Sequence, residues 1–396
     1  MTASRDHGLE KPAAWGAVCA MALGAFALIA SEFMPVSLLT PIAADLRITE
    51  GQAGQAIAIS GAFALLASLC VAPLAGRLDR KTLLLSLTLL MIASGTVVAL
   101  APDYHVFMFG RALIGVAIGG FWSMSAATTM RLVPDRDVPR ALAILNGGNA
   151  LAAIVAAPLG SFLGSIIGWR GAFFFVVPLA ALALAWKFVS LPSMPAQDAA
   201  RGNGVVRLMK RPAVALGMAA VSLFFMGQFA LFTYLRPFLE TVTGAGVSTL
   251  SFMLLLLGAA GFAGTTLIGG FLGKGLYRTL VAIPAMMAAI AVALVAFGGS
   301  TAATAALLAA WGLVATAAPV GWWTWLAKTL PRDAEAGGGL MVAVVQLAIM
   351  LGATAGGLLF DAGGYRSTFY MSAAVLVVAA VLAALAARAA SHAQAR

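Results

Sequence analysis

Charged residues are scarce in this chain. Only 10% of its 396 residues are Asp, Glu, Lys or Arg, whereas a soluble domain carries about 25%. Hydrophobic residues make up 62% of the chain, and few charges interrupt their longest runs. This composition excludes an ordinary soluble globular protein and predicts an integral membrane protein.

Cysteine and histidine are also rare, with two and three copies respectively. Cys19 and Cys70 both lie in apolar runs, so they provide neither a disulfide framework nor a metal-binding spacing. The sequence has no P-loop, no H-E-x-x-H and no G-x-S-x-G nucleophile elbow. We therefore expect no enzyme, no ATP-driven pump, no metal and no cofactor.

Twelve hydrophobic runs are long enough to cross a bilayer, which takes about 20 residues of α-helix. We therefore predict an all-α integral membrane protein with twelve transmembrane helices. The runs are approximately 15–40, 50–75, 82–101, 106–130, 140–167, 170–190, 213–238, 247–272, 277–298, 302–327, 336–360 and 367–388.

Lys and Arg residues are distributed unevenly among the connecting segments. With the N-terminus placed in the cytoplasm, 19 of the 24 fall in cytoplasmic segments, Lys187 among them, and 4 fall in outer loops, Arg236 among them. This asymmetry follows the positive-inside rule. It predicts that both termini are cytoplasmic, and it explains the net charge of +10 without a nucleic-acid partner.

A polar segment, residues 191–212, divides the chain into two similar halves. We predict an N-terminal six-helix bundle over 1–190, a cytoplasmic linker over 191–212 and a C-terminal six-helix bundle over 213–396. The motif Gly168-Trp169-Arg170 returns 196 residues later as Gly364-Tyr365-Arg366. Such a parallel repeat is typical of transporters whose substrate site lies near the midplane, between the halves.

Glu32 and Arg111 are charged residues well inside predicted spans. A carboxylate at the membrane centre costs about 2.5–3.5 kcal/mol on insertion scales, so it marks a functional site by default. We interpret Glu32 as the proton-carrying group and Arg111 as its partner; the alternatives are a structural carboxylate and an Arg that reaches the headgroups. At the repeat offset Glu32 corresponds to Gln228, a neutral amide, which predicts one proton site rather than two.

Two further segments are candidates for conformational roles. Pro158 permits a kink in span five, and Gly160 belongs to a stripe of small residues that lets another helix approach closely. This stripe predicts either ordinary packing or a sliding surface. The charged loop that contains Gly76, Asp79 and Arg80 is either an orientation signal or a latch, in which Asp79 caps a helix or pairs with an Arg.

These motifs resemble the major facilitator superfamily, drug:proton antiporter branch. Arg111-Ala112-Leu113-Ile114-Gly115 is similar to the span-four motif whose Arg is linked to proton transfer, although Ile114 replaces the usual Gln. Ala157-Pro158-Leu159-Gly160 is similar to the antiporter motif of span five, with Ala157 in place of a Gly. A narrower resemblance, to purine ribonucleoside efflux permeases, is carried by the segments Glu32 to Pro41, Gly119 to Ala126, Thr129 to Pro134, Gly227 to Ala230, Thr233 to Pro237 and Pro319 to Trp322.

The resemblance implies two pseudo-symmetric bundles that export inosine, guanosine and purine analogues in exchange for protons, by alternating access across a bacterial inner membrane. We expect a monomer whose partners are the small-molecule substrate, protons and the lipid bilayer. The alternatives are an exporter of sugars or multiple drugs, or a membrane sensor or scaffold that transports nothing. A flat nucleoside needs aromatic rings and side-chain amides, as in base recognition. The candidates near the midplane are Phe33, Trp122, Asn146, Asn149, Gln228, Phe232, Tyr234, Trp322 and Gln346.

Overall fold

The computed structural model describes residues 13–75, 78–195, 208–330 and 334–394. Regular structure in these residues is helical, without strands. Gly76 and most of the predicted linker lie outside them. The helices are α1 (Trp15–Leu46), α2 (Glu50–Ala75), α3 (Arg80–Ala99), α4 (Tyr104–Arg131), η1 (Asp135–Asp137), α5 (Val138–Ser190), α7 (Pro212–Thr233), α8 (Leu235–Thr241), α9 (Val247–Phe297), α10 (Thr301–Ala315), α11 (Ala318–Thr329) and α12 (Ala334–Gln394).

In the described part of the chain, nine helical stretches are long and apolar enough to cross a membrane. Within α5, α9 and α12 two helices meet at a glycine with non-helical geometry: Gly168, Gly275 and Gly364. Gly168 and Gly364, one repeat apart, have φ values of 73° and 68°, a region that a side chain disfavours. The count is lower than the twelve predicted runs because the residues on both sides of each glycine remain helical.

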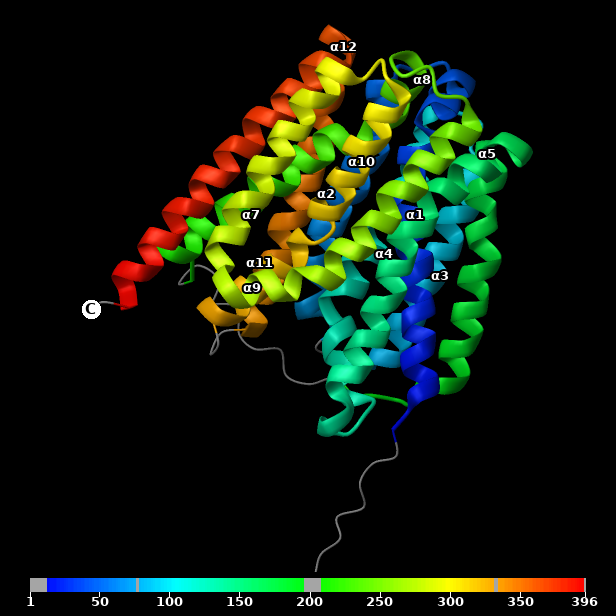
Figure 1. Cartoon of the computed structure of the whole chain (residues 1–396). Helices are drawn as coiled ribbons and strands as arrows, with labels where there is room; N and C mark the ends of the chain where they lie inside the picture. The colour runs from blue at the N-terminus through cyan, green and yellow to red at the C-terminus, as the bar shows by residue number, and fades with distance from the viewer. Residues whose placement is uncertain (1–12, 76–77, 196–207, 331–333, 395–396) are drawn as a thin grey trace, which may run out of the picture.

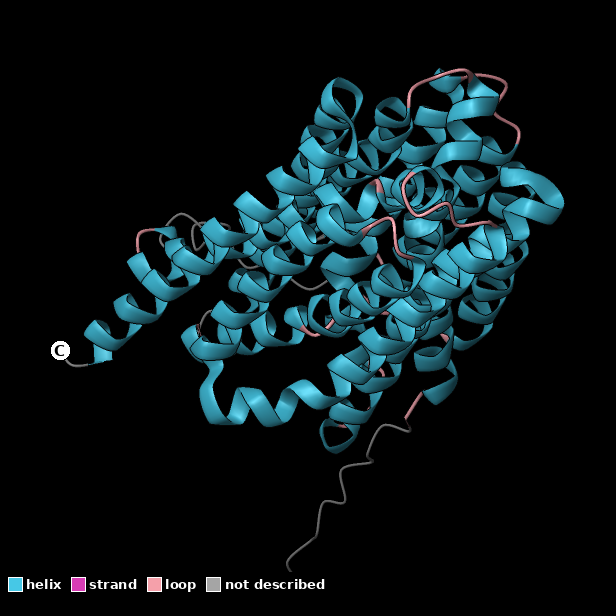
Figure 2. Ribbon diagram, turned by 45° about the horizontal axis from the view of Figure 1, so that its top comes forward, coloured by secondary structure: helices cyan, strands magenta, loops and turns pink. Residues whose placement is uncertain are grey.

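The helices run side by side through the bundle, with the loops at its two ends (Figures 1 and 2). Helices α1 to α5 form the first half, and α7 to α12 form the second. Both described chain ends lie at one end of the bundle, which we call the termini end, and α8 lies at the other, the far end. In Figure 1 the two sets of helices lie close together at the far end and spread apart toward the termini end.

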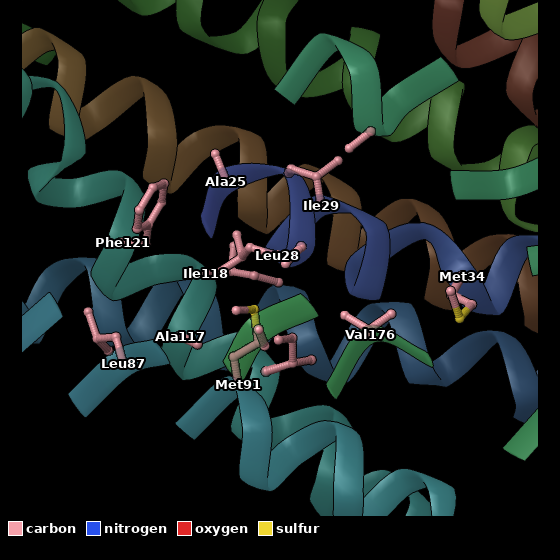
Figure 3. Packing of buried hydrophobic residues seen from close by; sticks show 14 of the residues in the cluster. Ala25, Leu28, Ile29, Met34, Leu87, Met91, Ala117, Ile118, Phe121 and Val176 are labelled. Atoms are coloured by element: carbon pink, nitrogen blue, oxygen red, sulfur yellow. The ribbon is translucent and has the colours of Figure 1, made fainter. Parts of the chain in front are cut away.

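Each half has its own apolar core, and a third cluster joins the two. Figure 3 shows part of the first core, in which α1, α3, α4 and α5 contribute buried side chains. The second core is built from α7 to α12. The joining cluster brings together residues of α1 and α2 with residues of α7 and α12: Val36, Ile57, Ala58, Phe229, Ile349 and Ala353.

Two glycines, one in each half, allow equivalent close contacts between the halves. Gly61 of α2 packs against the backbone of Gln346 and Met350 in α12, and Gly258 of α9 packs against the backbone of Ile154 in α5. Gly61 and Gly258 are 197 residues apart, and Ile154 and Met350 are 196 apart. The contacts between the halves therefore follow the same offset as the sequence repeat.

Polar contacts hold the halves together at the far end. The Asp361 carboxylate of α12 accepts from the Thr49 hydroxyl at 2.6 Å and from the Gly51 amide at 3.0 Å. The Tyr234 hydroxyl donates to the Ala353 carbonyl at 2.8 Å, close to the carbonyl of Gly51. We call these five residues the far-end clamp.

Arg236 adds a further contact at the far end and corrects one prediction. It is not in an outer loop but in α8, where it is 7% exposed. Its guanidinium forms an ion pair with Glu240 at 2.7 Å and donates to the Ser37 carbonyl of α1. That carbonyl is available because Pro41, four residues later, has no N–H to donate within the helix.

Candidate functional site

Arg111 is fully buried in the first half and held almost entirely by backbone carbonyls. Its guanidinium donates to the carbonyls of Ser31 at 2.8 Å, Glu32 at 3.1 Å and Ala56 at 3.2 Å. A weaker bond reaches the Ser60 hydroxyl at 3.4 Å. These acceptors pair four of the five N–H bonds of the guanidinium without an anion, so the position of Arg111 is fixed mainly by neutral backbone groups.

A proline explains why α1 offers one of those carbonyls. Pro35 lies inside α1 and cannot donate to the carbonyl four residues before it, which is that of Ser31. A buried carbonyl without a donor is destabilising, and Arg111 supplies the missing N–H at that point. The same arrangement occurs twice on α1: a proline frees a carbonyl, and a buried arginine donates to it. The pairs are Pro35 with Arg111 and Pro41 with Arg236.

Glu32 lies beside this cation and one helical turn before a residue of the cluster that joins the halves. It is 4% exposed, and the guanidinium of Arg111 bonds its backbone carbonyl. Val36, one turn later on the same helix face, belongs to the cluster that joins the two halves. A carboxylate at this position can change its charge at the surface where the halves meet, next to a fixed positive charge.

Three phenylalanine rings lie beside Glu32 along the line where α1 and α7 meet. Phe33 of α1 stacks on Phe229 of α7, with ring centroids 5.8 Å apart and planes at 27°. Phe33 also meets Phe232 edge to face at 6.2 Å. Because Phe33 and Phe232 are only half-buried, part of each ring is accessible to a ligand. Phe229 is a ring that the sequence interpretation missed.

Two amide oxygens of the second half are buried without a hydrogen-bond donor, on Gln228 in α7 and Gln346 in α12. A buried unpaired acceptor is costly, and a ligand with N–H or O–H groups removes that cost. The two asparagines differ from them. Asn149 is half-buried, whereas Asn146 is exposed and bonds the Leu142 carbonyl of its own helix.

Three predicted substrate residues are engaged in other contacts. Tyr234 belongs to the far-end clamp and stacks on Phe360 at 5.2 Å. Trp322 is 2% exposed, inside the second core, with its ring edge to face with Trp325. Trp122 is half-buried, packs against the first core and meets Phe121 edge to face at 5.4 Å. These three rings therefore have packing partners of their own in the structure.

The loop before α3 is tied to its own half. The Asp79 carboxylate accepts from the amides of Lys81 at 2.7 Å and Thr82 at 3.3 Å, and so caps α3. It also accepts from the Ser193 hydroxyl and the Met194 amide, and the Arg80 amide donates to the Met194 carbonyl. These bonds, led by the one from Ser193, hold the Asp79 pKa below its ordinary value. Of the two roles weighed for Asp79, the structure has the helix cap.

The small-residue stripe of α5 packs against α1. A Cβ at Gly160 would collide with the Ser37 hydroxyl, so glycine permits this close approach. Pro158 lies between Ala157, which joins the second core, and Gly160, which faces α1. This part of α5 therefore contacts both halves.

Lys187 corrects a further prediction. It lies in the last turn of α5 and is 1% exposed, so it is not part of a solvated cytoplasmic segment. Its position next to the polar linker in the sequence hid this burial.

The described residues contain no group of three or more His, Cys, Asp or Glu side chains suited to a metal ion.

The comparisons with known proteins agree with this architecture. A family model described as the Major Facilitator Superfamily matches residues 21–341. The chain is 63% identical to the transcription regulatory protein OpdE of Pseudomonas aeruginosa, over 96% of this chain and 95% of that protein. It is 40% identical to the purine ribonucleoside efflux pump NepI of Salmonella typhimurium, over 96% of each chain.

Solved structures show the same fold at low sequence identity. One is the bacterial homolog of the human lysosomal transporter Spinster, in an inward-facing and occupied conformation, with a TM-score of 0.75, 17% identity and coverage of 94% of this chain and 96% of that one. Another is the human organic anion transporter MFSD10, with a TM-score of 0.66, 17% identity and coverage of 94% and 100%. The chain is a multi-pass membrane protein and not an enzyme, and it belongs to the Major Facilitator Superfamily.

Proposed function

We propose that this protein exports purine ribonucleosides such as inosine and guanosine, together with purine analogues, in exchange for protons. Transport occurs by alternating access across the bacterial inner membrane. The observation that carries the proposal is the placement of Glu32, a buried carboxylate beside the fixed charge of Arg111, on the helix face where the two halves meet. A proton on Glu32 removes a charge from that surface, and this is a physical link between proton binding and movement of the halves.

The substrate class is supported by the three phenylalanine rings beside Glu32 and by the two unpaired amide oxygens. Purines are flat, and their edges carry N–H groups that pair with side-chain amides. The 40% identity to NepI, named a purine ribonucleoside efflux pump, supports the same class. An exporter of sugars or multiple drugs is the alternative, and a site that lacks a preference for purines would favour it.

The membrane topology is part of the proposal. Counting the two helices that meet at Gly168, at Gly275 and at Gly364 separately, the chain crosses the membrane twelve times as two six-helix bundles. The distribution of Lys and Arg places the termini end in the cytoplasm. With the far-end clamp closed, the molecule is then closed on the outer side, and it works as a monomer.

Transport by purified protein in sealed liposomes tests the proposal. We expect a proton gradient to drive inosine uphill, and an inosine gradient to move protons in the opposite direction. The exposed carboxylate Asp135 provides a matched control, since Asp135→Asn removes a charge far from Glu32 and should leave exchange intact. Equal uphill transport of an unrelated sugar or drug, with none of inosine, would replace the substrate assignment.

The name of the relative that is 63% identical supports a second role. An exporter that lowers the internal concentration of a metabolite changes the transcription of genes that respond to that metabolite. Deletion of the gene should then alter transcription, and the Glu32→Gln variant should fail to restore it. Restoration by a variant that folds but does not transport would favour a sensor instead.

A further inference from the structure

The ammonium of Lys187 points into the first half rather than out of it. Its Nζ donates to the Thr88 hydroxyl at 3.0 Å and lies 5.2 Å from the ring centroid of Phe121. It also lies against Gly24 of α1, where a Cβ would collide with it. Helical side chains lean toward the N-terminus of their own helix. For Lys187, in the last turn of α5, that direction leads from the end of the helix toward the interior of the bundle. A snorkelling lysine would instead extend its ammonium toward the nearby end of the helix.

Lys187 has no acidic partner among the residues that the structure describes. The elements packed against its ammonium contribute only uncharged side chains: Gly24 and Leu28 of α1, Leu87, Thr88 and Met91 of α3, and Phe121 of α4. Leu28, Leu87, Met91 and Phe121 belong to the apolar core drawn in Figure 3. The space beside them, about 10 Å³, is close to the smallest that holds one water molecule.

A lone buried ammonium is costly, whereas a neutral amine in the same place is not. The site therefore responds strongly to any nearby charge that changes. Arg111 does not change, since a guanidinium stays protonated in proteins. The changeable charge on the neighbouring helix is Glu32, which lies eight residues after Gly24 on α1 and so about 12 Å further along the helix.

We propose that Lys187 binds a proton when Glu32 releases one and loses it when Glu32 is protonated. The net charge inside the first half then changes by less than one unit while Glu32 switches. This inference rests on the proposed role of Glu32 as the proton-carrying group. The step is a proton transfer alone: the ammonium gives one proton to water at the termini end, and the amine later takes one back. Lys187 therefore adds no proton to the transport stoichiometry.

The size of the coupling follows from Coulomb's law. Two unit charges about 12 Å apart, at an effective dielectric constant of about 20, change each other's proton-binding constant about tenfold. Coupled sites of this strength titrate as a pair rather than independently. The effect is therefore large enough to be measured as a shift of about one pH unit.

Carbon-13 labelling of lysine side chains measures the charge of Lys187 directly in the full chain. The sequence has only six lysines, and Lys187→Met identifies the signal by its loss. In a titration from about pH 6 to about pH 9, exposed lysines stay charged. We expect the Lys187 signal to titrate in this range, with a midpoint about one unit lower in Glu32→Gln than in the wild type. Asp135→Asn should leave the midpoint unchanged.

A midpoint that is the same in the wild type and Glu32→Gln overturns the proposal, and so does a Lys187 signal that stays charged throughout. If Lys187→Met does not fold, Thr88→Val removes the only oxygen that accepts from Nζ in the described structure and identifies the signal by displacing it. In liposomes, Lys187→Met should keep the wild-type number of protons per nucleoside but shift the pH dependence of transport. Wild-type protein that moves no protons would refute the proposed function, while the lysine titration still decides the coupling.

Discussion

The two halves of the bundle share a fold but differ in the charges that they bury. The first half encloses Glu32, Arg111 and Lys187. The second half buries the cation Arg236, but places it at the far end in an ion pair with Glu240. The positions 196 residues after the three buried charges are uncharged: Gln228, Leu307 and Ala383.

We propose that this difference separates proton exchange and substrate contact between the two bundles. Each buried ion costs several kcal/mol unless it is compensated, so charges are retained where a proton must be handled. The second half carries neutral amides instead, which bind hydrogen-bonding groups without a change in charge. We therefore assign proton exchange to the first half and most of the polar substrate contacts to the second.

Moving the carboxylate to the other half tests this assignment most severely. We expect Glu32→Gln to abolish uphill inosine export in liposomes, because it removes the titratable group and keeps the shape. Adding Gln228→Glu should not restore export. The position that corresponds to Arg111 in the second half is Leu307, so the new acid has no fixed positive charge beside it. Downhill exchange of inosine should survive in Glu32→Gln, and uphill export at the wild-type rate would disprove the role of Glu32.

Removing the fixed cation should have the next largest effect. Arg111→Ala leaves the Ser31 carbonyl without a donor and Glu32 without its neighbouring charge, so we expect coupled transport to fall at least a hundredfold. Arg111→Lys should recover only part, because an ammonium cannot reproduce the planar fork of the guanidinium. Normal coupling in the Ala variant would assign Arg111 to anchoring α4 alone.

Loss of a neutral amide should weaken substrate binding without affecting proton binding. We expect Gln228→Ala to reduce inosine transport about tenfold, as the loss of about 1–3 kcal/mol of base contact predicts, while proton binding at Glu32 is retained. Trp322→Ala is the contrasting variant, because a buried Trp in a core contributes about 3–5 kcal/mol to stability. Thermal unfolding should separate the two, with a clear loss of stability only in Trp322→Ala.

The far-end clamp should control which end of the bundle is open. Asp361→Ala removes the acceptor of both the Thr49 and the Gly51 bonds, and bonds to charged groups contribute about 1.5–3 kcal/mol each before exposure reduces them. We expect a several-fold rise in molecules that are open at the far end. Spin labels at Leu100→Cys and Gly299→Cys, which are exposed far-end positions, would report it as a longer distance. An unchanged distance distribution would show that the apolar contacts alone keep this end closed.

The smallest effect concerns the pH dependence of the Asp79 cap. The Asp79 pKa is lower in the folded protein than its ordinary value, so its stabilisation is present above the ordinary carboxyl pKa and is lost as pH falls through the lowered value. Because Asp79 is largely solvated, we expect less than about 1 kcal/mol. The difference in unfolding temperature between the wild type and Asp79→Ala should shrink at low pH, and a difference that is independent of pH would contradict the cap.

Composition and residue spacing alone predict the helices, two of the buried charges and the repeat. The hydrophobic runs locate the helices, because a helix in lipid must be apolar along its whole length. Glu32 and Arg111 stand out because charge in such a run is expensive. The offset of 196 residues likewise predicts the matched geometry of Gly168 and Gly364.

Other features depend on contacts that no local pattern reveals. Whether Trp322 faces a ligand or a core depends on the rotation of α11, which its neighbours Trp323 and Trp325 leave ambiguous. Lys187 lies beside a polar linker, so its sequence context indicates solvent, and only the packing of α1 and α3 shows the opposite. The prolines of α1 could have indicated where the buried arginines bind. Each proline frees the carbonyl four residues before it, and an arginine donates to that carbonyl.

The two prolines of α1 also have a consequence for the synthesis of the protein. The carbonyls of Ser31 and Ser37 lack helical donors when α1 leaves the ribosome, and an unpaired carbonyl is poorly tolerated in lipid. Arg111 arrives with α4, early in translation, but Arg236 arrives only after the second half has begun. We therefore expect the first half on its own to retain an open acceptor at Ser37 until α8 docks beside it.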